Sequence, residues 1–486
     1  MKRKIVLIGL AFFIFFSLSA CSKYPRELST DEVQDFLQKI SDSPFGLDIK
    51  VDNANITSEL AKKGRYRVFL KNPDFSFSTE VYKHLNIPFP VFKLPVEMEE
   101  MVFIYGPSEE YCEILSATGV NFSLNMKEFV QKMELEEEKK DIEKIPEMDL
   151  SFNIGNISFK NYNLSPMLDT TNQDFIEVLA KLLATNQPTG ILVDDAKFEF
   201  NMVQKDGKYI MTCSIKNAET LTTLAPEVLI AFIKQEESGA LFSQLLEDGK
   251  SPLEIKSVLE NMEISLKTTK GDIDADLENM DVAYYIKPTS GKDAFKFGYD
   301  LNIGALNVTY PEKKEVETFA GLNKMNLNFS IEGLSPEFFQ AYIDIIKMSQ
   351  TLSTSKDPAL KQQMAMKGQA LVGNLMQSKP VISLSLSPLE HKLGRIEAEG
   401  KFQFIRMGPP VGKATVTIFN VEEIGQKLKA DQLFPPEVID AAMAKIQEVF
   451  EIDQNGNGIL TFEIKEEDQA NFYLNGKPQS FGGVKK

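Results

Sequence analysis

The chain has 486 residues, of which 43% are hydrophobic and 25% are charged, and its formal net charge at pH 7 is −17. This share of apolar residues is enough to form folded cores, so a disordered chain is excluded. The acidic excess and the lack of a basic cluster argue against nucleic acid as a partner. A chain of this length is expected to contain several domains.

The N-terminus has the order of a bacterial export signal. Three basic residues at positions 2–4 precede an apolar stretch, and Leu-Ser-Ala-Cys follows at positions 18–21. The apolar run is shorter than the roughly 20 residues that cross a bilayer. The sequence therefore predicts a cleaved signal peptide over residues 1–20 rather than a permanent transmembrane helix.

Residues 18–21 resemble the lipobox of bacterial lipoproteins. This resemblance implies that Cys21 is lipidated and becomes the first residue of the mature protein. Each acyl chain contributes about 0.8 kcal/mol per buried methylene, and two or more chains give stable attachment. The membrane is therefore an expected partner. Ser22 follows the cysteine, which by the same resemblance implies the periplasmic face of the outer membrane if the cell has two membranes.

A short linker over residues 21–28 leads into an N-terminal α+β region, expected at 29–148. The capping box from Ser29 to Glu32 precedes apolar residues at helical spacing between Val33 and Ile40, which predicts an amphipathic helix. Short strands are expected after it. A charged run that ends near residue 147 marks the boundary of this region.

Alternating apolar residues predict strands in the two regions that follow, a middle region at 149–314 and a C-terminal region at 315–486. Phe198, Phe200 and Met202 share one face of an extended chain, and alternate residues do the same over 295–303 and 325–331. This alternation favours antiparallel sheets with one covered face.

Three helices are expected to begin at Pro226, Pro336 and Pro436, because each proline precedes a glutamate and an apolar helical pattern. A further helix is expected over residues 358–377. The fold class predicted from these elements is α+β, with antiparallel β-sheets half-covered by amphipathic helices. The similar order of elements leaves open whether a strand-then-helix unit is repeated.

The C-terminal region resembles the YdgA-like family of bacterial envelope proteins. The shared features are the alternating strand that leads into Gly-Leu-Ser-Pro-Glu at 333–337, a helical pair, Leu-Met-Gln-Ser-Lys-Pro at 375–380, and Phe-Tyr-Leu-Asn-Gly-Lys-Pro at 472–478. The resemblance covers about residues 315–480. It implies an elongated α+β envelope protein of uncharacterised function and assigns no chemistry. Family members are expected to begin with an uncleaved anchor, whereas this chain has a lipobox.

Two groups of residues are candidate metal or disulfide sites. Asp453, Asn455 and Asn457 resemble the opening of a calcium loop, although isoleucine stands at the twelfth position, where a glutamate is required. The alternative is a structural turn. Cys112 and Cys213 could pair in an oxidising periplasm or could remain two separate buried thiols.

No catalytic motif is found, so an enzyme is not expected, and neither is a cofactor. Asp272, Asp274, Asp276 and Glu278 alternate along one strand, but their spacing of roughly 7 Å suits a solvated strand face better than a metal site. The two histidines, His84 and His391, stand apart from any zinc or nucleophile pattern.

The expected function is non-catalytic binding or envelope maintenance, with a Phe-rich sheet face that holds an apolar ligand. One alternative is a scaffold of an envelope complex that binds another envelope protein and no small ligand. A second alternative is an envelope hydrolase that uses carboxylates. Periodicity alone does not decide whether the phenylalanines at 198, 200, 295 and 297 line an open groove or a closed core.

Overall fold

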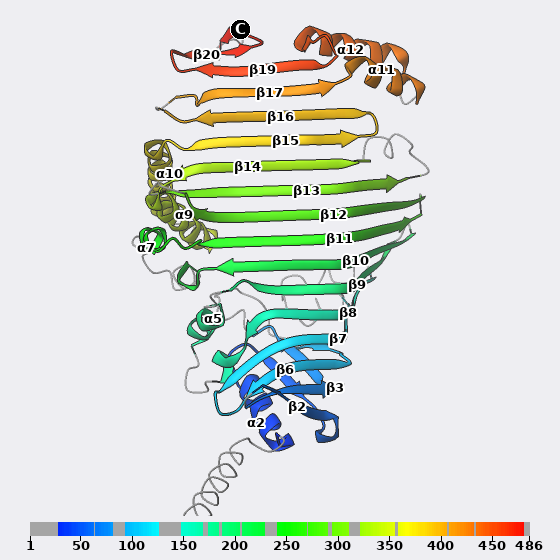
Figure 1. The fold of residues 1–486 in the computed structure, drawn as a ribbon, viewed down its shortest axis with the longest axis vertical. Coiled ribbons are helices and arrows are strands. Elements are labelled where there is room, and N and C mark those ends of the chain that lie inside the picture. Colours follow the sequence, from blue (N-terminus) through cyan, green and yellow to red (C-terminus); the bar gives the residue numbers. More distant parts are fainter. Residues whose placement is uncertain are drawn as a thin grey trace, which may run out of the picture.

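A computed structural model shows that most of the chain forms one large antiparallel β-sheet, whose strands follow one another along the long axis of the molecule (Figure 1). The structure describes residues 28–480, with gaps at 63, 81–92, 126–146, 169–173, 184–186, 205–206, 229–240, 270, 290–293, 311–320, 355–357, 406–407 and 432–433.

The large sheet has 18 strands, and neighbouring strands in it are antiparallel. In chain order these strands are β2 (Ile56–Lys62), β3 (Arg65–Lys71), β6 (Glu100–Gly106), β7 (Tyr111–Asn125), β8 (Glu147–Asn163), β9 (Thr189–Gln204), β10 (Gly207–Leu224), β11 (Leu253–Thr268), β12 (Gly271–Pro288), β13 (Phe295–Thr309), β14 (Lys324–Leu334), β15 (Val381–His391), β16 (Gly394–Gln403), β17 (Val411–Phe419), β18 (Glu451–Ile452), β19 (Gly458–Lys465), β20 (Asp468–Leu474) and β21 (Lys477–Ser480).

A small sheet and several helices complete the described part of the fold. The small sheet consists of β1 (Leu47–Lys50), β4 (Asp74–Ser78) and β5 (Lys93–Val96). The α-helices are α2 (Thr30–Ser41), α5 (Phe175–Leu183), α7 (Leu241–Glu247), α9 (Pro336–Thr354), α10 (Pro358–Ser378), α11 (Val421–Ala430) and α12 (Pro436–Val449), and the 3₁₀ helices are η1 (Asn53–Asn55) and η3 (Ser165–Leu168).

The predicted fold class is wrong, although the predicted alternating strands and the helices after Pro336 and Pro436 are confirmed. The protein is 58% strand and 25% helix, and helices do not cover half of its sheet. The prediction failed because successive hairpins all add their strands to the same sheet, whereas several separate sheets were expected. The boundary expected at residue 148 falls within β8, and β13 and β14, on either side of the boundary expected at 314, pair directly.

The capping box predicted from the sequence is present at the start of α2. The Glu32 amide donates a hydrogen bond to the Ser29 hydroxyl at 3.2 Å, and the Ser29 amide donates to the Glu32 carboxylate at 2.9 Å. The apolar side of the helix is buried on β3 and β6, where the Phe36 ring stacks on Tyr105 at 4.6 Å. Full burial of such a side chain contributes about 1.5 to 3 kcal/mol. This core fixes α2 at the β2 end of the large sheet.

A second core lies where α7 and α9 cover the beginning of β13 and the end of β14. Phe295 is completely buried there, with its ring centroid 6.0 Å from that of Phe242 and 5.4 Å from that of Phe339. Helix α10 packs against α9 and lies at the same end of the strands (Figure 1). These helices therefore cover one end of the middle strands and not their whole length.

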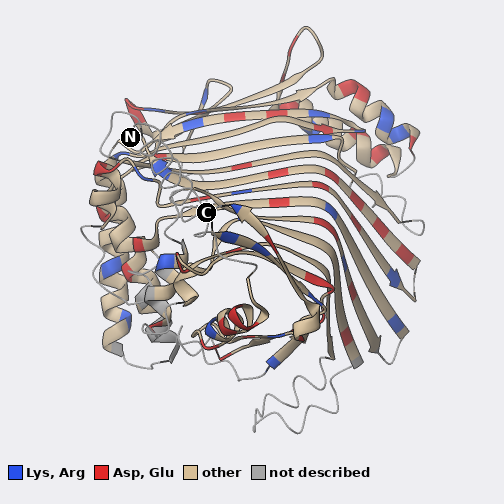
Figure 2. Cartoon of the chain, turned by 60° about the horizontal axis from the view of Figure 1, so that its bottom comes forward, with Lys and Arg blue, Asp and Glu red and all other residues tan. Residues whose placement is uncertain are grey.

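The middle strands bend sharply along a line that crosses the sheet. The pairing between β10 and β13 omits one residue per strand, namely Asn217, Glu260, Asn279 and Gly304, while the residues on both sides of each are paired. Asn217 and Asn279 have left-handed backbone, with φ of 50° and 52°. The strand segments beyond this line turn toward the side of the sheet that carries the helices (Figure 2). We call these segments the outer arm.

Candidate functional site

One face of the large sheet carries an unbroken row of apolar residues, called the inner row here. Residues directly opposite one another on neighbouring strands share a face, so the strand register identifies its members. From β2 to β19 they are Ile56, Leu70, Met101, Ala117, Ile157, Val193, Ala218, Leu259, Met280, Ile303, Met325, Leu389, Ile396, Ile418 and Gly458. No member of this row has a polar side chain.

A second apolar row, the outer row, runs beside the first on the far side of the bend. Its members from β7 onward are Val120, Ile154, Ala196, Ile215, Met262, Leu277 and Leu306, with Leu322 bridged to the last. Inner-row and outer-row residues on one strand are three apart, as Leu259 and Met262 are. Such residues point to opposite faces of a regular strand. The bend reverses the alternation, so both rows lie on one face.

The exposure of β11 supports this reversal. Before the bend the exposed residues are Glu254 and Lys256, at even positions, and after the bend they are Glu263 and Lys267, at odd positions. A regular strand would keep one parity throughout. The two rows and the apolar residues that alternate with them on either side of the bend form what we call the apolar face.

The opposite face of the sheet is polar on both sides of the bend. It carries charges of both signs, including Lys197, Glu199, Asp300 and Lys401. The main aromatic exception is Tyr285, a buried residue whose ring lies against Gly298 and is covered by the Lys287 ammonium at 4.1 Å. Water solvates the charged face well, whereas contact between water and the apolar face is unfavourable.

Much of the apolar face stays accessible. Phe152 is 39% exposed, Ile191 36% and Leu384 44%, and their strands span a large part of the sheet. In the outer arm, the two phenylalanines predicted to share a face, Phe198 and Phe200, are both partly exposed. The accessible surface therefore extends well beyond the parts that helices cover.

Aromatic rings contact one another from strand to strand on this face. The Phe152 ring lies 5.9 Å from Phe122 and 4.8 Å from Phe198, which links β7, β8 and β9. Further along the sheet, the Phe297 ring lies 5.2 Å from Tyr284 and 6.2 Å from Phe329. Such pairs are worth about 0.5 to 1.5 kcal/mol beyond their buried area, so they help to stabilise the packing of neighbouring strands on this face.

The Phe-rich face is closed where α7 and α9 cover it and open in the outer arm. Phe295 is sealed beneath α7 and α9, and Phe297 is partly buried against the same core. Phe198 and Phe200 lie in the outer arm and remain accessible. The four residues have the same alternating pattern in the sequence, and only the position of the helices separates them.

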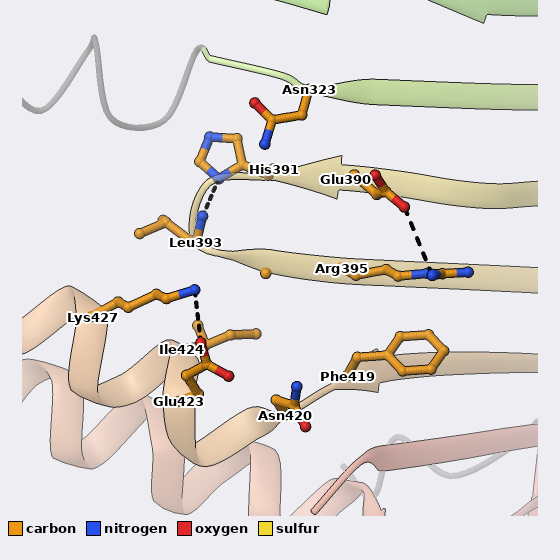
Figure 3. Close-up of a pocket in the computed structure, with 11 residues that line it drawn as sticks. Asn323, Glu390, His391, Leu393, Arg395, Phe419, Asn420, Glu423, Ile424 and Lys427 are labelled. Atoms are coloured by element: carbon orange, nitrogen blue, oxygen red, sulfur yellow. Dashed lines mark hydrogen bonds and ion pairs between the residues drawn. The ribbon is translucent and has the colours of Figure 1, made fainter. Parts of the chain in front are cut away.

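A polar pocket of about 390 Å³ lies between the β15–β16 turn and α11 (Figure 3). The Leu393 amide donates to Nδ1 of His391 at 3.1 Å, and the Lys427 ammonium lies 2.9 Å from the Glu423 carboxylate. Arg395 lies 3.7 Å from Glu390. The cations and anions of this pocket neutralise one another, and it presents no activated nucleophile. We assign it no chemistry.

The acidic residues of β12 lie on the solvated strand face that the sequence favoured. Asp272 lies opposite Lys267 in the register, and Asp274 and Asp276 line a second pocket, of about 420 Å³, on the polar face of the outer arm. Glu278 lies next to the bend. Within the described ranges, no three His, Cys, Asp or Glu side chains come together closely enough to hold a metal ion.

The calcium-like segment forms a turn in which Asp453 serves its own backbone. Its carboxylate accepts hydrogen bonds from the Asn457 amide at 2.9 Å, the Asn457 side chain at 3.0 Å and the Asn455 amide at 2.8 Å. The hydrogen bond from the Asn457 backbone is the main cause of a lowered pKa for Asp453. These bonds engage both carboxylate oxygens of Asp453 in the turn, and the calcium site stays a prediction.

Both cysteines of the folded body are free thiols. Cys112 lies in the core beneath α2, where complete burial raises the pKa of its thiol well above the ordinary value. Cys213 lies on β10, opposite Phe198, and partial burial raises the pKa of its thiol as well. Three strand spacings of about 4.8 Å separate β7 from β10, which exceeds the span of a disulfide.

Cys21, His84 and the signal peptide over residues 1–20 lie outside the described residues, and so does most of the helix expected to begin at Pro226, of which only residues 226–228 are described. In the part of the chain that the structure describes, no helix has the length and apolar character needed to span a bilayer. The lipid anchor and the export signal therefore stay predictions.

Sequence reasoning did not find the two apolar rows, because a row is made of residues that are far apart in the chain. A signal was present in single strands, where apolar residues change from odd to even positions, as at Leu277 and Met280. Comparison with family models, with curated proteins and with solved structures found no match to this chain, so the YdgA-like resemblance also stays a prediction.

Proposed function

We propose that this protein is a membrane-tethered, non-catalytic binder of hydrocarbon chains, which lie on the apolar face of the large sheet. The observation that carries the proposal is the inner row, in which every residue from Ile157 to Ile418 is apolar and all but Leu259 stay partly accessible. The tether is the lipid expected on Cys21.

The size of the accessible face is the first argument for a ligand. From β8 to β17 the accessible inner row crosses about nine strand spacings of 4.8 Å, so it is about 43 Å long. A strip only four residues wide would then have an area of roughly 600 Å². Soluble monomers rarely expose larger apolar patches, and patches of this size are often binding sites.

The chemistry of the face is the second argument. Protein partners need about one hydrogen bond per 100 to 200 Å² of interface. The side chains of the inner and outer rows offer no donor or acceptor, and the row residues themselves are paired with their neighbours in the strand register. A hydrocarbon chain needs no such partners. The shape agrees, because the outer arm turns toward the apolar side and gives that side a concave form (Figure 2).

Native mass spectrometry of the full-length lipoprotein, extracted from its own membranes in mild detergent, tests the proposal. We expect bound lipid masses on the wild type. Ile264→Asp places a carboxylate on the apolar face of the outer arm, so it should lose most of this lipid.

Glu263→Gln is the matched control, because Glu263 adjoins Ile264 on β11 and lies on the polar face. It should keep the lipid. A wild-type protein free of lipid would contradict the proposal, and so would equal lipid on Ile264→Asp and Glu263→Gln. The intact mass of the same material also tests the tether, since residue 21 should be the first residue and should carry acyl chains.

A further inference from the structure

We infer that the apolar face is a path along which a hydrocarbon chain moves across the sheet, from the end near α2 toward β19, rather than a single closed site. This inference rests on the proposed function. It adds transfer of an acyl chain away from the membrane to the binding proposed above.

The first argument is the length of the path. The accessible inner row, from β8 to β17, is about 43 Å long, as estimated from the strand spacing. The hydrocarbon core of a bilayer is about 30 Å thick, so the chains of one leaflet extend about 15 Å. One acyl chain would therefore cover only about a third of the row. A face built to hold one chain would not need the remainder.

The second argument is that the row is continuous. From Ile157 on β8 to Ile418 on β17, each step to the next strand leads from one apolar side chain to another. A hydrocarbon chain that slides along the row therefore exchanges one set of apolar contacts for an equivalent set. A single buried carboxylate would break this equivalence, because an unpaired charge against hydrocarbon is strongly unfavourable.

The third argument is that α7 and α9 leave the row free between β8 and β17. The α7 and α9 core lies over Phe295 on β13, whereas the inner-row residue of that strand is Ile303, about 26 Å further along the strand. Ile303 and its neighbour Met325 are both partly accessible. The helices therefore flank the path and do not block it.

The position of α2 gives the path a direction. Helix α2 begins at Thr30 and lies at the β2 end of the sheet, while the C-terminal strands lie at the opposite end (Figure 1). The residues between Cys21 and Thr30 can reach at most about 30 Å. A lipid on Cys21 would thus hold the α2 end near the membrane and leave β19 far from it.

The experiment uses the full-length lipoprotein in vesicles of phosphatidylethanolamine and phosphatidylglycerol. A small fraction of the phosphatidylethanolamine carries a diazirine at the end of one acyl chain. After illumination, mass spectrometry locates the labelled peptides near Val193 on β9 and near Ile396 on β16. The wild type should be labelled at both places.

Two barrier variants, Met280→Asp and Ile303→Asp, put a carboxylate in the middle of the row on adjoining strands. Each variant should keep the labelling near Val193, which also shows that it is folded. The labelling near Ile396 should fall at least tenfold. Ala283→Asp is the matched control, because it adds the same group to β12 on the polar face, opposite Lys256. It should be labelled as the wild type is.

Two outcomes would overturn the path. One is labelling near Ile396 that the barrier variants leave unchanged, and the other is a wild type labelled near Val193 alone. Either result would leave hydrocarbon binding in place. A wild type that is labelled at neither position would instead overturn the proposed function, so the two failures are distinguishable.

Discussion

Replacing Phe295 with alanine should cost the fold far more stability than replacing Phe152, although both phenylalanines lie on the apolar face. Phe295 is fully buried between Phe242 and Phe339 under the helices. Phe152 lies in the outer arm and is 39% exposed. The comparison separates the sealed end of the face from its accessible part.

The magnitudes follow from burial. Truncation of a fully enclosed phenylalanine leaves a cavity and costs about 3 to 5 kcal/mol. Phe152 buries about three fifths of its surface, and full burial of such a side chain is worth about 1.5 to 3 kcal/mol. Water can enter the space that its ring leaves, so no cavity term is added. We therefore expect a loss of about 1 to 2 kcal/mol for Phe152→Ala.

Urea unfolding of the chain from residue 22 onward, followed by far-ultraviolet circular dichroism, measures both losses without lipid present. The variants should differ by about 2 kcal/mol, which is a factor of roughly 30 in the unfolding equilibrium. Equal losses would refute the reasoning, because they would mean that Phe152 is enclosed as tightly as Phe295.

Three further measurements test particular parts of the fold. Gly298→Ala should lower the melting temperature, because a Cβ there would lie 2.1 Å from an aromatic ring. Gly373 in α10 has open space around it, so Gly373→Ala should raise the free energy of unfolding by up to about 1 kcal/mol. Iodoacetamide should alkylate Cys213 before Cys112 in timed mass spectrometry, because only Cys112 is fully buried. Because the pKa of Asp453 is lowered in the fold, its ionised carboxylate stabilises the fold at pH values above the ordinary aspartate pKa. This contribution is lost as the pH falls through the lowered pKa. Asp453→Asn should therefore lose less stability than the wild type between pH 5 and pH 2 in urea titrations.

Features set by neighbouring residues could be predicted from the sequence. The capping box at Ser29 and Glu32 needs only four residues, and its hydrogen bonds formed as expected. The alternation over 295–303 fixed a strand, because side chains two apart share a face whatever lies above them. Each of these patterns is complete within one turn of helix or one strand.

The number of sheets could not be predicted, because it depends on which strands pair and not on what each strand contains. Amphipathic helices suggested layers over several sheets. In the structure the two described cores place α2, α7 and α9 at limited parts of a single sheet. An apolar helix side shows that the helix covers something, but it does not show how much of a face remains uncovered.

The bend could have been read in part from the sequence. In the strand at 271–288, apolar residues occupy odd positions up to Leu277 and even positions from Met280 onward, with Asn279 between them. A change of parity within one strand, at an asparagine that accepts left-handed backbone, is the local signature of a reversal in alternation. The line became visible only when the register placed the same change on neighbouring strands.

This reversal is what makes the apolar face suitable for a hydrocarbon chain. Without it, one strand segment would present its apolar side chains to the concave side and the other would present them to the convex side. With it, Leu259 and Leu277 on neighbouring strands are both buried, on either side of the bend. A chain that follows the bend line would contact both arms at once and so bury more of its surface than on a flat sheet. The unpaired residues of the bend, including Asn217, are therefore as important to the proposed path as the apolar residues beside them.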